Sequence, residues 1–574
     1  MIKLFKFLKP YRVSIIFVLI LAFVQSLSEL YLPNLMSNVV NIGIVKGDVG
    51  YILRIGGTML LIAIISTLCA ITASFLSSQI SVGFGRILRG KIFAKVESYS
   101  LQEFEKIGTS SLITRTTNDI MQIQHCIMII MRMMISAPMM CIGGIIMAMS
   151  KDAKLSLAII IVICVLIAII SLIAKKVLPL FTAVQSKLDK LNQVLREGLA
   201  GIRVIRAFNR GEYEKKRFND ANRDLTEIAT KVNRMMGGLM PIMSLIMNFT
   251  VIAIIWFGSI RIDNGSIQVG DLMAVTQYVM QILFSLLMFS MIFVMIPRAS
   301  ISASRINEVL NTEISVKDAH KVINANDKKG FVEFKNVTFS YPDAEQPLIN
   351  DVSFSANPGE ITAIIGSTGS GKSTLINLML RFYDINSGRI LVNGIDIMEM
   401  SQHDLRNKIG FVPQKAVLFS GTIADNIKYG KQDATDEEIR SAADIAQATE
   451  FIQNIENGFN HIIAQDGINI SGGQKQRISI ARALVKKPEI YIFDDGFSAL
   501  DFKTEAKLRK ALKNTIEDSA MIIVAQRVSA VMDADRIIVL DNGKIAGIGS
   551  HKELLKTCKV YSEIVSSQLS EEEI

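Results

Sequence analysis

Six long apolar runs lie within residues 1–300 and constrain the fold more than any other feature of the chain. A helix that crosses the hydrocarbon core of a bilayer needs about 20 apolar residues, and each run has that length. Half of the 574 residues are hydrophobic and the mean hydropathy is +0.36, values that favour a membrane protein over a soluble one. The runs lie at about residues 13–35, 53–79, 125–149, 155–178, 238–260 and 272–297. We therefore expect six membrane-spanning helices.

Basic residues beside the apolar runs indicate how the helices are oriented. The formal net charge is +9, but no block of Lys and Arg with interleaved aromatic residues suggests a nucleic-acid partner, and we expect none. Lys and Arg favour the cytoplasmic side of a membrane, and here they follow the second and fourth runs. An even number of spans then leaves both termini in the cytoplasm. The basic residues are Arg86, Arg89, Lys91, Lys95, Lys175, Lys176, Arg203, Arg206 and Arg210.

The two cytoplasmic connections between these runs are long and keep a helical pattern. They join the second run to the third and the fourth run to the fifth, with few Gly or Pro breaks. We therefore expect the helices to extend well beyond the bilayer. Each connection turns at a short polar stretch, at residues 106–110 and 208–212, and these turns could touch a cytoplasmic domain.

Polar and sulfur-containing side chains within the spans are candidates for a substrate cavity. Ionisable groups in hydrocarbon are costly and usually face a cavity or a partner. Glu29 lies deep in the first run, where either a cavity-facing role or a structural hydrogen bond would explain it, whereas Arg132 lies near the inner interface and can snorkel. Met243 and Met288 belong to a set of methionines whose flexible thioethers suit a pocket for varied apolar ligands. Ordinary gap-filling between helices explains any single methionine equally well.

The composition changes after residue 298, where long apolar runs give way to strand-like alternation. We expect a membrane domain over residues 1–312, a linker over 313–330 and a soluble α/β domain over 331–574. The predicted fold class is thus multidomain, with an all-α transmembrane domain of six helices followed by an α/β domain.

The α/β domain contains a predicted phosphate-binding loop. A strand-like run at 361–365 precedes the loop and a helical pattern follows it, which is the context that such a loop requires. Its glycines allow backbone N–H groups to surround the phosphates, Lys372 reaches the β and γ oxygens, and the Ser373 hydroxyl ligates Mg²⁺. The loop consists of Gly366, Ser367, Thr368, Gly369, Ser370, Gly371, Lys372, Ser373 and Thr374.

Two further segments extend this predicted site. The apolar run 490–493 ends at Asp494, an arrangement that holds Mg²⁺ through water beside the phosphate loop. Between the two lies a glycine-rich turn that opens a helix and can offer N–H groups to a phosphate, although such a turn by itself would be ordinary. This turn consists of Ser471, Gly472, Gly473 and Gln474.

With these motifs the chain resembles the ATP-binding cassette (ABC) family over its whole length, and its domain order is similar to that of a type I exporter half-transporter. The resemblance implies that Tyr341 stacks on the adenine of ATP. It also implies that Gln414 contacts Mg²⁺ and relays to the membrane helices, and that Asp501 belongs to the D-loop. Each ATP would lie between the phosphate loop of one cassette and the Ser471–Gln474 loop of another. A second half-transporter is therefore implied as a partner.

The sequence departs from the family pattern at two positions of the ATP site. Asp495 stands where the family usually has a glutamate that polarises the attacking water, and Gln526 replaces the switch histidine that contacts the γ-phosphate. Aspartate is one methylene shorter, which withdraws the carboxylate by about 1.5 Å and weakens general-base catalysis. Glutamine can donate a hydrogen bond but carries no charge. We expect this site to bind ATP and to hydrolyse it poorly.

The leading hypothesis is one subunit of a heterodimeric, multidrug-type exporter in the plasma membrane of a bacterium. A different chain would carry the glutamate and the histidine, and the intact Ser471–Gln474 loop of this chain would complete the partner's site. The substrates would be hydrophobic or amphipathic compounds moved out of the cell across the lipid bilayer. A lipid flippase or a peptide exporter is the nearest alternative, and an ATP-gated channel or regulatory subunit is an alternative of a different class.

Overall fold

The computed structural model describes residues 1–318, 329–342, 344–515 and 518–569. Contacts between residues divide the chain into two compact units. The first unit comprises residues 1–97 and 109–312, and the second comprises residues 98–108 and 313–574. The predicted linker at 313–330 lies partly outside the described residues.

The first unit is helical, and within the described residues six helices are long and apolar enough to cross a membrane. This confirms the prediction of six spans. The longest apolar helices also exceed the bilayer: α6 has 48 residues, about 72 Å at 1.5 Å per residue, against a hydrocarbon core of roughly 30 Å. The helices are η1 (Ile2–Tyr11), α1 (Arg12–Asn38), η2 (Val39–Ile44), α2 (Val49–Glu97), α4 (Thr109–Thr116), α5 (Asn118–Lys151), α6 (Ala153–Ala200), α7 (Ile202–Ala207), α8 (Gly211–Asp263) and α9 (Val269–Asn311).

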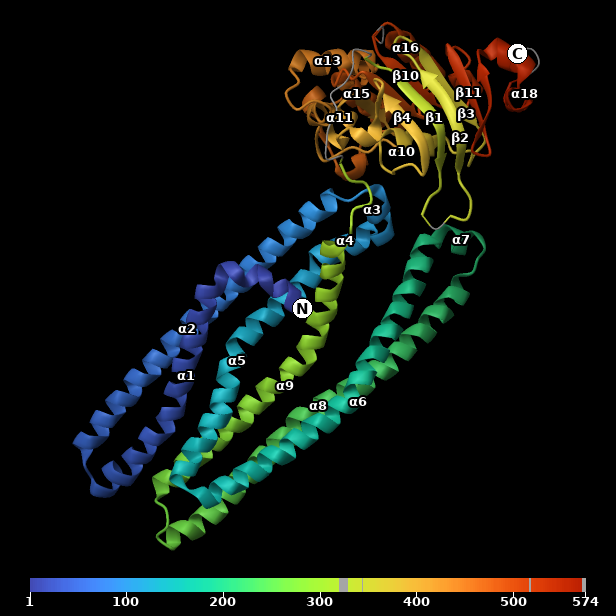
Figure 1. Ribbon diagram of the computed structural model, residues 1–574. Coiled ribbons are helices and arrows are strands. Elements are labelled where there is room, and N and C mark those ends of the chain that lie inside the picture. The colour runs from blue at the N-terminus through green and yellow to red at the C-terminus, as the bar shows by residue number, and fades with distance from the viewer. Residues whose placement is uncertain (319–328, 343, 516–517, 570–574) are drawn as a thin grey trace. The chain divides into compact units, whose positions relative to one another are not determined.

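The long helices of this unit pack in pairs, α1 with α2, α5 with α9 and α6 with α8 (Figure 1). Gly144 of α5 lies against Ile282 of α9, and a Cβ at this glycine would approach the isoleucine side chain to 2.7 Å. Small residues permit such close helix packing in membranes. Tyr278 of α9 is fully buried, and its hydroxyl donates to the Leu30 carbonyl of α1 at 3.0 Å. The α1, α5 and α9 helices therefore share a packed core.

Ion pairs fasten one end of this helix unit. Lys151 at the end of α5 pairs with Asp271 near the start of α9 at 3.1 Å, and Ser37 of α1 donates to the same carboxylate at 2.8 Å. Asp152 lies between α5 and α6, is buried, and pairs with Arg261 of α8 at 2.6 Å. These contacts join five helices through two carboxylates.

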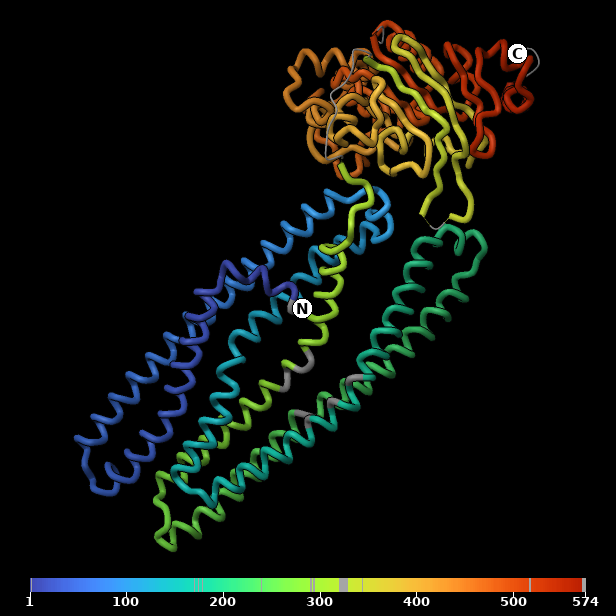
Figure 2. The backbone as a smooth tube through the Cα atoms, in the orientation of Figure 1, coloured from blue at the N-terminus to red at the C-terminus, as the bar shows by residue number. Residues whose placement is uncertain are grey.

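The second unit combines a mainly parallel sheet with an antiparallel sheet and helices packed against them. Figure 2 traces the backbone of its larger segment, coloured from yellow-green to red at the C-terminus. In the described residues the larger sheet has the order β12-β11-β3-β10-β9-β6 and the smaller β2-β1-β4-β5. The five residues of β10 are all buried, as expected for a central parallel strand covered on both faces. The α/β architecture predicted for this part of the chain is therefore confirmed.

The strands of this unit are β1 (Val332–Phe339), β2 (Ile349–Ala356), β3 (Ile361–Gly366), β4 (Ser387–Val392), β5 (Ile395–Asp396), β6 (Ile409–Val412), β7 (Gly421–Thr422), β8 (Ile462–Ile463), β9 (Ile490–Asp494), β10 (Ala520–Val524), β11 (Arg536–Asp541) and β12 (Lys544–Gly549). Its α-helices are α3 (Leu101–Ile107), α10 (Lys372–Met379), α11 (Gln402–Asn407), α12 (Ile423–Lys428), α13 (Asp436–Ile445), α14 (Thr449–Asn454), α15 (Gly472–Val485), α16 (Phe502–Lys513), α17 (His551–Thr557) and α18 (Lys559–Ser566).

The short helix α3 belongs to the second unit although it lies between two helices of the first. Leu101 packs against the apolar core of the α/β unit. Glu103 is buried and accepts hydrogen bonds from the backbone N–H groups of Ser100 at 2.9 Å and Ser315 at 3.2 Å. Residues 98–108 of the connection between α2 and α5 are therefore part of the α/β unit.

Candidate nucleotide site

The predicted site residues come together because their strands are neighbours in the larger sheet. β10 lies between β3 and β9, and Val524 is in register with Ile364 on one side and Asp494 on the other. The three strands are parallel, so their carboxyl ends meet at one edge, where ligands of open α/β sheets bind. β6 follows next to β9 with Val412 opposite Phe493. The phosphate loop and the segments holding Asp494, Gln526 and Gln414 all start from this edge.

The phosphate loop connects β3 to α10. Gly369 and Gly371 have φ values of +85° and +101°, a conformation that favours glycine. A Cβ at Gly371 would also lie 2.5 Å from Ile349 Cδ1. These two glycines let the backbone curl before α10 begins at Lys372, which leaves N–H groups at a helix N-terminus available to phosphate.

Lys372 lies folded over this loop. Its Nζ donates to the carbonyls of Gly366 at 2.8 Å and Ser367 at 2.7 Å, and the residue is only 7% exposed. Burial lowers the pKa of Lys372, and the carboxylates of Asp494 and Asp495 oppose that shift. The Ser370 hydroxyl is also buried and has no hydrogen-bond partner among the described residues. A buried cation and an orphaned hydroxyl fit a loop that receives phosphate oxygens.

Ser373 and Asp494 provide oxygen atoms for a divalent cation. The Ser373 hydroxyl donates to the Asp494 carboxylate at 3.4 Å. Burial raises the pKa of Asp494, Asp495 adds to the shift, and the Ser373 hydrogen bond and Lys372 oppose it. No cluster of three His, Cys, Asp or Glu side chains in the described part of the chain forms a metal site. Mg²⁺ would therefore be held by the Ser373 and Asp494 oxygens together with phosphate oxygens, which are the hard ligands that it prefers.

Asp495 and Gln414 face each other across the same edge. Gln414 Nε2 donates to Asp495 Oδ2 at 3.4 Å. Asp495 has φ +51°, and its backbone is fixed by a hydrogen bond from its N–H to Val524 O at 2.8 Å. Gln526 is exposed, and its carbonyl accepts from Gln568 Nε2 at 2.9 Å. Sequence reasoning had no signal for Gln568, because the residue lies 42 positions away along the chain.

Tyr341 lies beside the phosphate loop. Its hydroxyl is 3.1 Å from Thr374 Oγ1, and its ring packs against Phe339 and Tyr383. This position is compatible with the adenine contact that the family resemblance implies. Tyr383 was not found from the sequence, since it lies in no motif.

The Ser471–Gln474 loop and Asp501 form a separate group. Ser471 caps α15, with Gln474 N–H donating to Ser471 Oγ at 3.4 Å and Ser471 N–H donating to Gln474 Oε1 at 3.0 Å. Gly473 lies against the Ala499 carbonyl, which a Cβ would approach to 3.0 Å. Asp501 caps α16 by accepting from Thr504 N–H at 3.0 Å. In the described residues no hydrogen bond joins this loop to the phosphate loop of the same chain.

The candidate cavity residues of the membrane unit have different surroundings. Glu29 is half-buried and accepts from Gln25 Nε2 of the same helix at 2.9 Å. Met243 is buried in a cluster with Leu30 and Tyr278, whereas Met288 is half-buried. These contacts fit the structural interpretation of Glu29 and Met243 at least as well as a cavity role.

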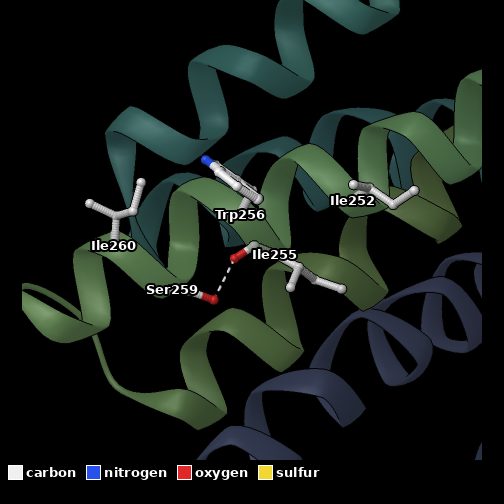
Figure 3. A pocket seen from close by; sticks show the side chains of 5 residues that line it. All are labelled: Ile252, Ile255, Trp256, Ser259 and Ile260. Atoms are coloured by element: carbon white, nitrogen blue, oxygen red, sulfur yellow. Dashed lines mark hydrogen bonds between the residues drawn. The ribbon is translucent and has the colours of Figure 1, made fainter.

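An open groove of about 410 Å³ lies on α8 (Figure 3). It is lined by Ile252, Ile255, Trp256, Ser259 and Ile260, and the Ser259 hydroxyl is satisfied by the Ile255 carbonyl at 2.7 Å. All five residues belong to one helix, so the groove is a notch in an exposed helix surface and not a cavity enclosed by several helices.

Two family models match this chain. The transmembrane region of ABC transporters matches residues 15–287, and the ABC transporter model matches residues 349–498, which contain the phosphate loop, the Ser471–Gln474 loop and Asp494. An uncharacterized ABC transporter ATP-binding protein of Mycobacterium tuberculosis is 42% identical over 98% of this chain and 97% of its own length. This chain belongs to the ABC transporter family.

Other relatives of this ABC transporter agree with that assignment. A protein of Bacillus subtilis with the same description is 38% identical over 99% of both chains. A fatty acid ABC transporter ATP-binding/permease protein of Mycobacterium bovis is 33% identical over 83% of this chain and 75% of its own. The solved structure of a bacterial Atm1-family ABC exporter with ATP bound matches with a TM-score of 0.82 and 27% identity, covering 98% and 99% of the two chains. The protein is therefore an ATP-driven exporter whose cassette is an ATPase coupled to transport.

Proposed function

We propose that this ABC transporter is the weakly hydrolysing subunit of a heterodimeric exporter in a bacterial plasma membrane, with both termini in the cytoplasm. The observation that carries the proposal is the pair Asp495 and Gln526, which stand at the family's glutamate and histidine positions next to an otherwise intact phosphate loop. A homodimer would contain two impaired sites, which is a poor arrangement for a pump.

The local contacts of Asp495 support a weak site. Its carboxylate is one methylene shorter than that of glutamate, and the Gln414 amide binds it. A general base must come within hydrogen-bond reach of the attacking water, and a displacement of about 1 Å can cost around a hundredfold in rate. Gln526 can donate a hydrogen bond to a γ-phosphate but cannot add positive charge.

The Ser471–Gln474 loop supports a role in a partner's site. Its N-cap geometry is intact, Ser471 and Gly472 are exposed, and the loop opens α15. Ser471 and Gln474 use their N–H groups on each other, so the Gly472 and Gly473 N–H groups are the ones available to a phosphate of another chain. In this proposal the phosphate loop, Tyr341 and Gln414 bind Mg²⁺ and ATP in this chain, while Ser471 to Gln474, with Asp501 nearby, complete the hydrolytic site of the partner.

The substrates we propose are hydrophobic or amphipathic compounds. The fatty-acid transporter among the relatives favours amphipathic lipids within this class. Lipid transport is thus the second candidate. A lipid transporter would differ from a multidrug exporter because one class of lipid would inhibit the transport of every other compound.

The test is reconstitution of this chain in liposomes, alone and with its candidate partner subunit, followed by measurement of phosphate release and of efflux of a fluorescent amphipathic dye. We expect fast hydrolysis only in the mixed complex. An Asp495→Ala change here should lower the rate much less than removal of the partner's glutamate. Competition by fatty acids against dye efflux distinguishes the two substrate classes.

Two results would contradict the proposal. One is rapid ATP hydrolysis by this chain alone. The other is a loss of turnover with Asp495→Ala as complete as that caused by the partner's mutation. Ion current without uphill transport would point instead to a gated channel.

A further inference from the structure

An aromatic cluster next to the phosphate loop holds the Tyr341 ring in a fixed plane. Phe339 and Tyr383 contact this ring edge-to-face, with centroids 5.0 and 5.2 Å away and interplanar angles of 79° and 86°. Such T-shaped contacts are a favourable geometry for aromatic pairs. The Tyr341 hydroxyl is held as well, 3.1 Å from Thr374 Oγ1 at the end of the loop. The ring is therefore preorganised on the side where a nucleotide base would lie.

Tyr383 connects this cluster to α3. It is 5% exposed, and its hydroxyl donates to Glu105 Oε2 at 3.1 Å. A buried hydroxyl that loses its partner is costly, so the position of Glu105 matters to the position of the ring. Burial, the hydrogen bond to Glu105 and the charge of that carboxylate raise the pKa of Tyr383 above its ordinary value. The phenol thus stays protonated and remains a donor.

We propose that Tyr383 and Glu105 form a relay that couples adenine binding on Tyr341 to the seating of α3, the helix in the first cytoplasmic connection between membrane spans. The proposal rests on the proposed ATP site, since adenine must meet Tyr341. An adenine ring on Tyr341 restrains the tyrosine, the edge-to-face contact restrains Tyr383, and the donated hydrogen bond holds Glu105 and α3. Tyr383 is a positioning residue in this scheme, because it acts through Tyr341.

The coupling is reciprocal. If ATP binding favours the seated position of α3, then seated α3 must favour ATP binding by the same factor. α3 has a second attachment, through Glu103, which we do not expect to be coupled to ATP binding. The Glu103 carboxylate binds Ser100 and Ser315, and in the described residues it makes no hydrogen bond to the aromatic cluster. Glu103 therefore attaches α3 without a hydrogen bond to Tyr341, Tyr383 or Phe339 in the described residues.

The experiment is hydrogen–deuterium exchange of the full chain in nanodiscs, with and without MgATP, read at the Leu101–Ile107 amides, together with calorimetric titration of ATP. In the wild-type chain ATP should slow exchange in this segment. Tyr383→Phe keeps the ring and removes the hydroxyl, so it should abolish the ATP-dependent slowing and weaken ATP binding by about threefold to tenfold, the value of one hydrogen bond.

The matched control is Tyr561→Phe. Tyr561 is also fully buried in the cassette, and its hydroxyl is bonded to His551 Nδ1 at 2.7 Å, outside the aromatic cluster. This variant should leave both readouts at the wild-type value.

Glu105→Ala is the second test: the side chain is exposed, so its removal spares the fold and should reproduce the effect of Tyr383→Phe. Glu105→Gln keeps an acceptor oxygen and should restore part of the coupling.

The relay is wrong if Tyr383→Phe and Glu105→Ala both keep the full ATP-dependent protection of residues 101–107, or if the wild-type chain binds ATP without any change there. A different failure concerns the ATP site itself. If the Lys372→Ala variant binds ATP as tightly as the wild-type chain, the proposed nucleotide site is wrong, and the relay that depends on it is wrong too.

Discussion

Gln414 Nε2 donates to Asp495 Oδ2 at 3.4 Å, which joins the second residue after β6 to the first residue after β9. Asp495 is held in a left-handed conformation at φ +51°, and its N–H is bonded to the end of β10. The backbone at this position is therefore fixed by the sheet, and the reach of the side chain alone decides where the carboxylate lies.

Asp495→Glu should raise ATP hydrolysis at this site, and Gln526→His should raise it further. The added methylene moves the carboxylate outward by about 1.5 Å, and a correction of that size can restore up to roughly a hundredfold in rate. Phosphate release should be measured in a complex whose partner lacks its own glutamate, so that only this site is active. A double variant no faster than the wild-type chain would show that other residues limit hydrolysis here.

Lys372→Ala should weaken ATP binding by roughly 10- to 100-fold, since it removes a charged donor to the phosphates. Equilibrium binding of a fluorescent ATP analogue to the full chain measures this. Lys486 is a matched control, because its Nζ also donates to two carbonyls, of Arg406 at 2.6 Å and Ile409 at 2.9 Å, and burial lowers its pKa too. Equal loss of binding with Lys486→Ala would mean that Lys372 acts through folding and not through contact with phosphate.

Local patterns in the sequence predicted which segments meet at this edge, because the phosphate loop and Asp494 are each anchored on a strand. Gln414 came only from the family resemblance. Once the strands are parallel neighbours, the sheet brings these patterns to one edge. Side-chain partners distant in sequence were not predictable. Tyr383 and Gln568 lie in no motif, and their contacts depend on packing between segments.

In the membrane half, too, local features were predictable from the sequence and contacts between distant residues were not. Hydropathy alone predicted six spans, because length and apolar composition are sufficient physical requirements for a spanning helix. The ion pair of Asp152 with Arg261 joins residues 109 positions apart, and no periodicity links them. The sequence indicated only that this connection could touch a cytoplasmic domain. It did not indicate that Glu103 and Glu105 make the hydrogen bonds.

The attachment of α3 through Glu103 should weaken in acid. Burial raises the pKa of this carboxyl, but the hydrogen bonds from Ser100 and Ser315 outweigh burial and hold the pKa below its ordinary value of 4.5. A lowered pKa in the folded state means that the attachment contributes its full stability above the ordinary value. That contribution is lost as the pH falls through the lower, folded-state pKa.

Glu103→Gln should therefore destabilise α3 near neutral pH, and the difference from the wild-type chain should shrink below pH 4.5. Exchange of the Leu101–Ile107 amides at a series of pH values, corrected for intrinsic rates, measures both. A difference between the two chains that stays constant with pH would contradict the role of the ionised carboxylate.

Arg261→Ala should destabilise the membrane unit more than an ordinary surface change does. The substitution leaves the Asp152 carboxylate buried without its cation, and breaking a buried pair in this way costs about 3 kcal/mol or more. Arg217→Ala is the control, because Arg217 pairs with Glu197 where both side chains are exposed, and exposed pairs contribute little. The midpoint of thermal aggregation in detergent should fall by several degrees for the first variant and stay near the wild-type value for the second.

Asp152→Asn combined with Arg261→Ala removes the unpaired charge and should recover part of the loss. If Arg261→Ala lowers the midpoint no more than Arg217→Ala, the Asp152–Arg261 pair does not hold the helix ends together.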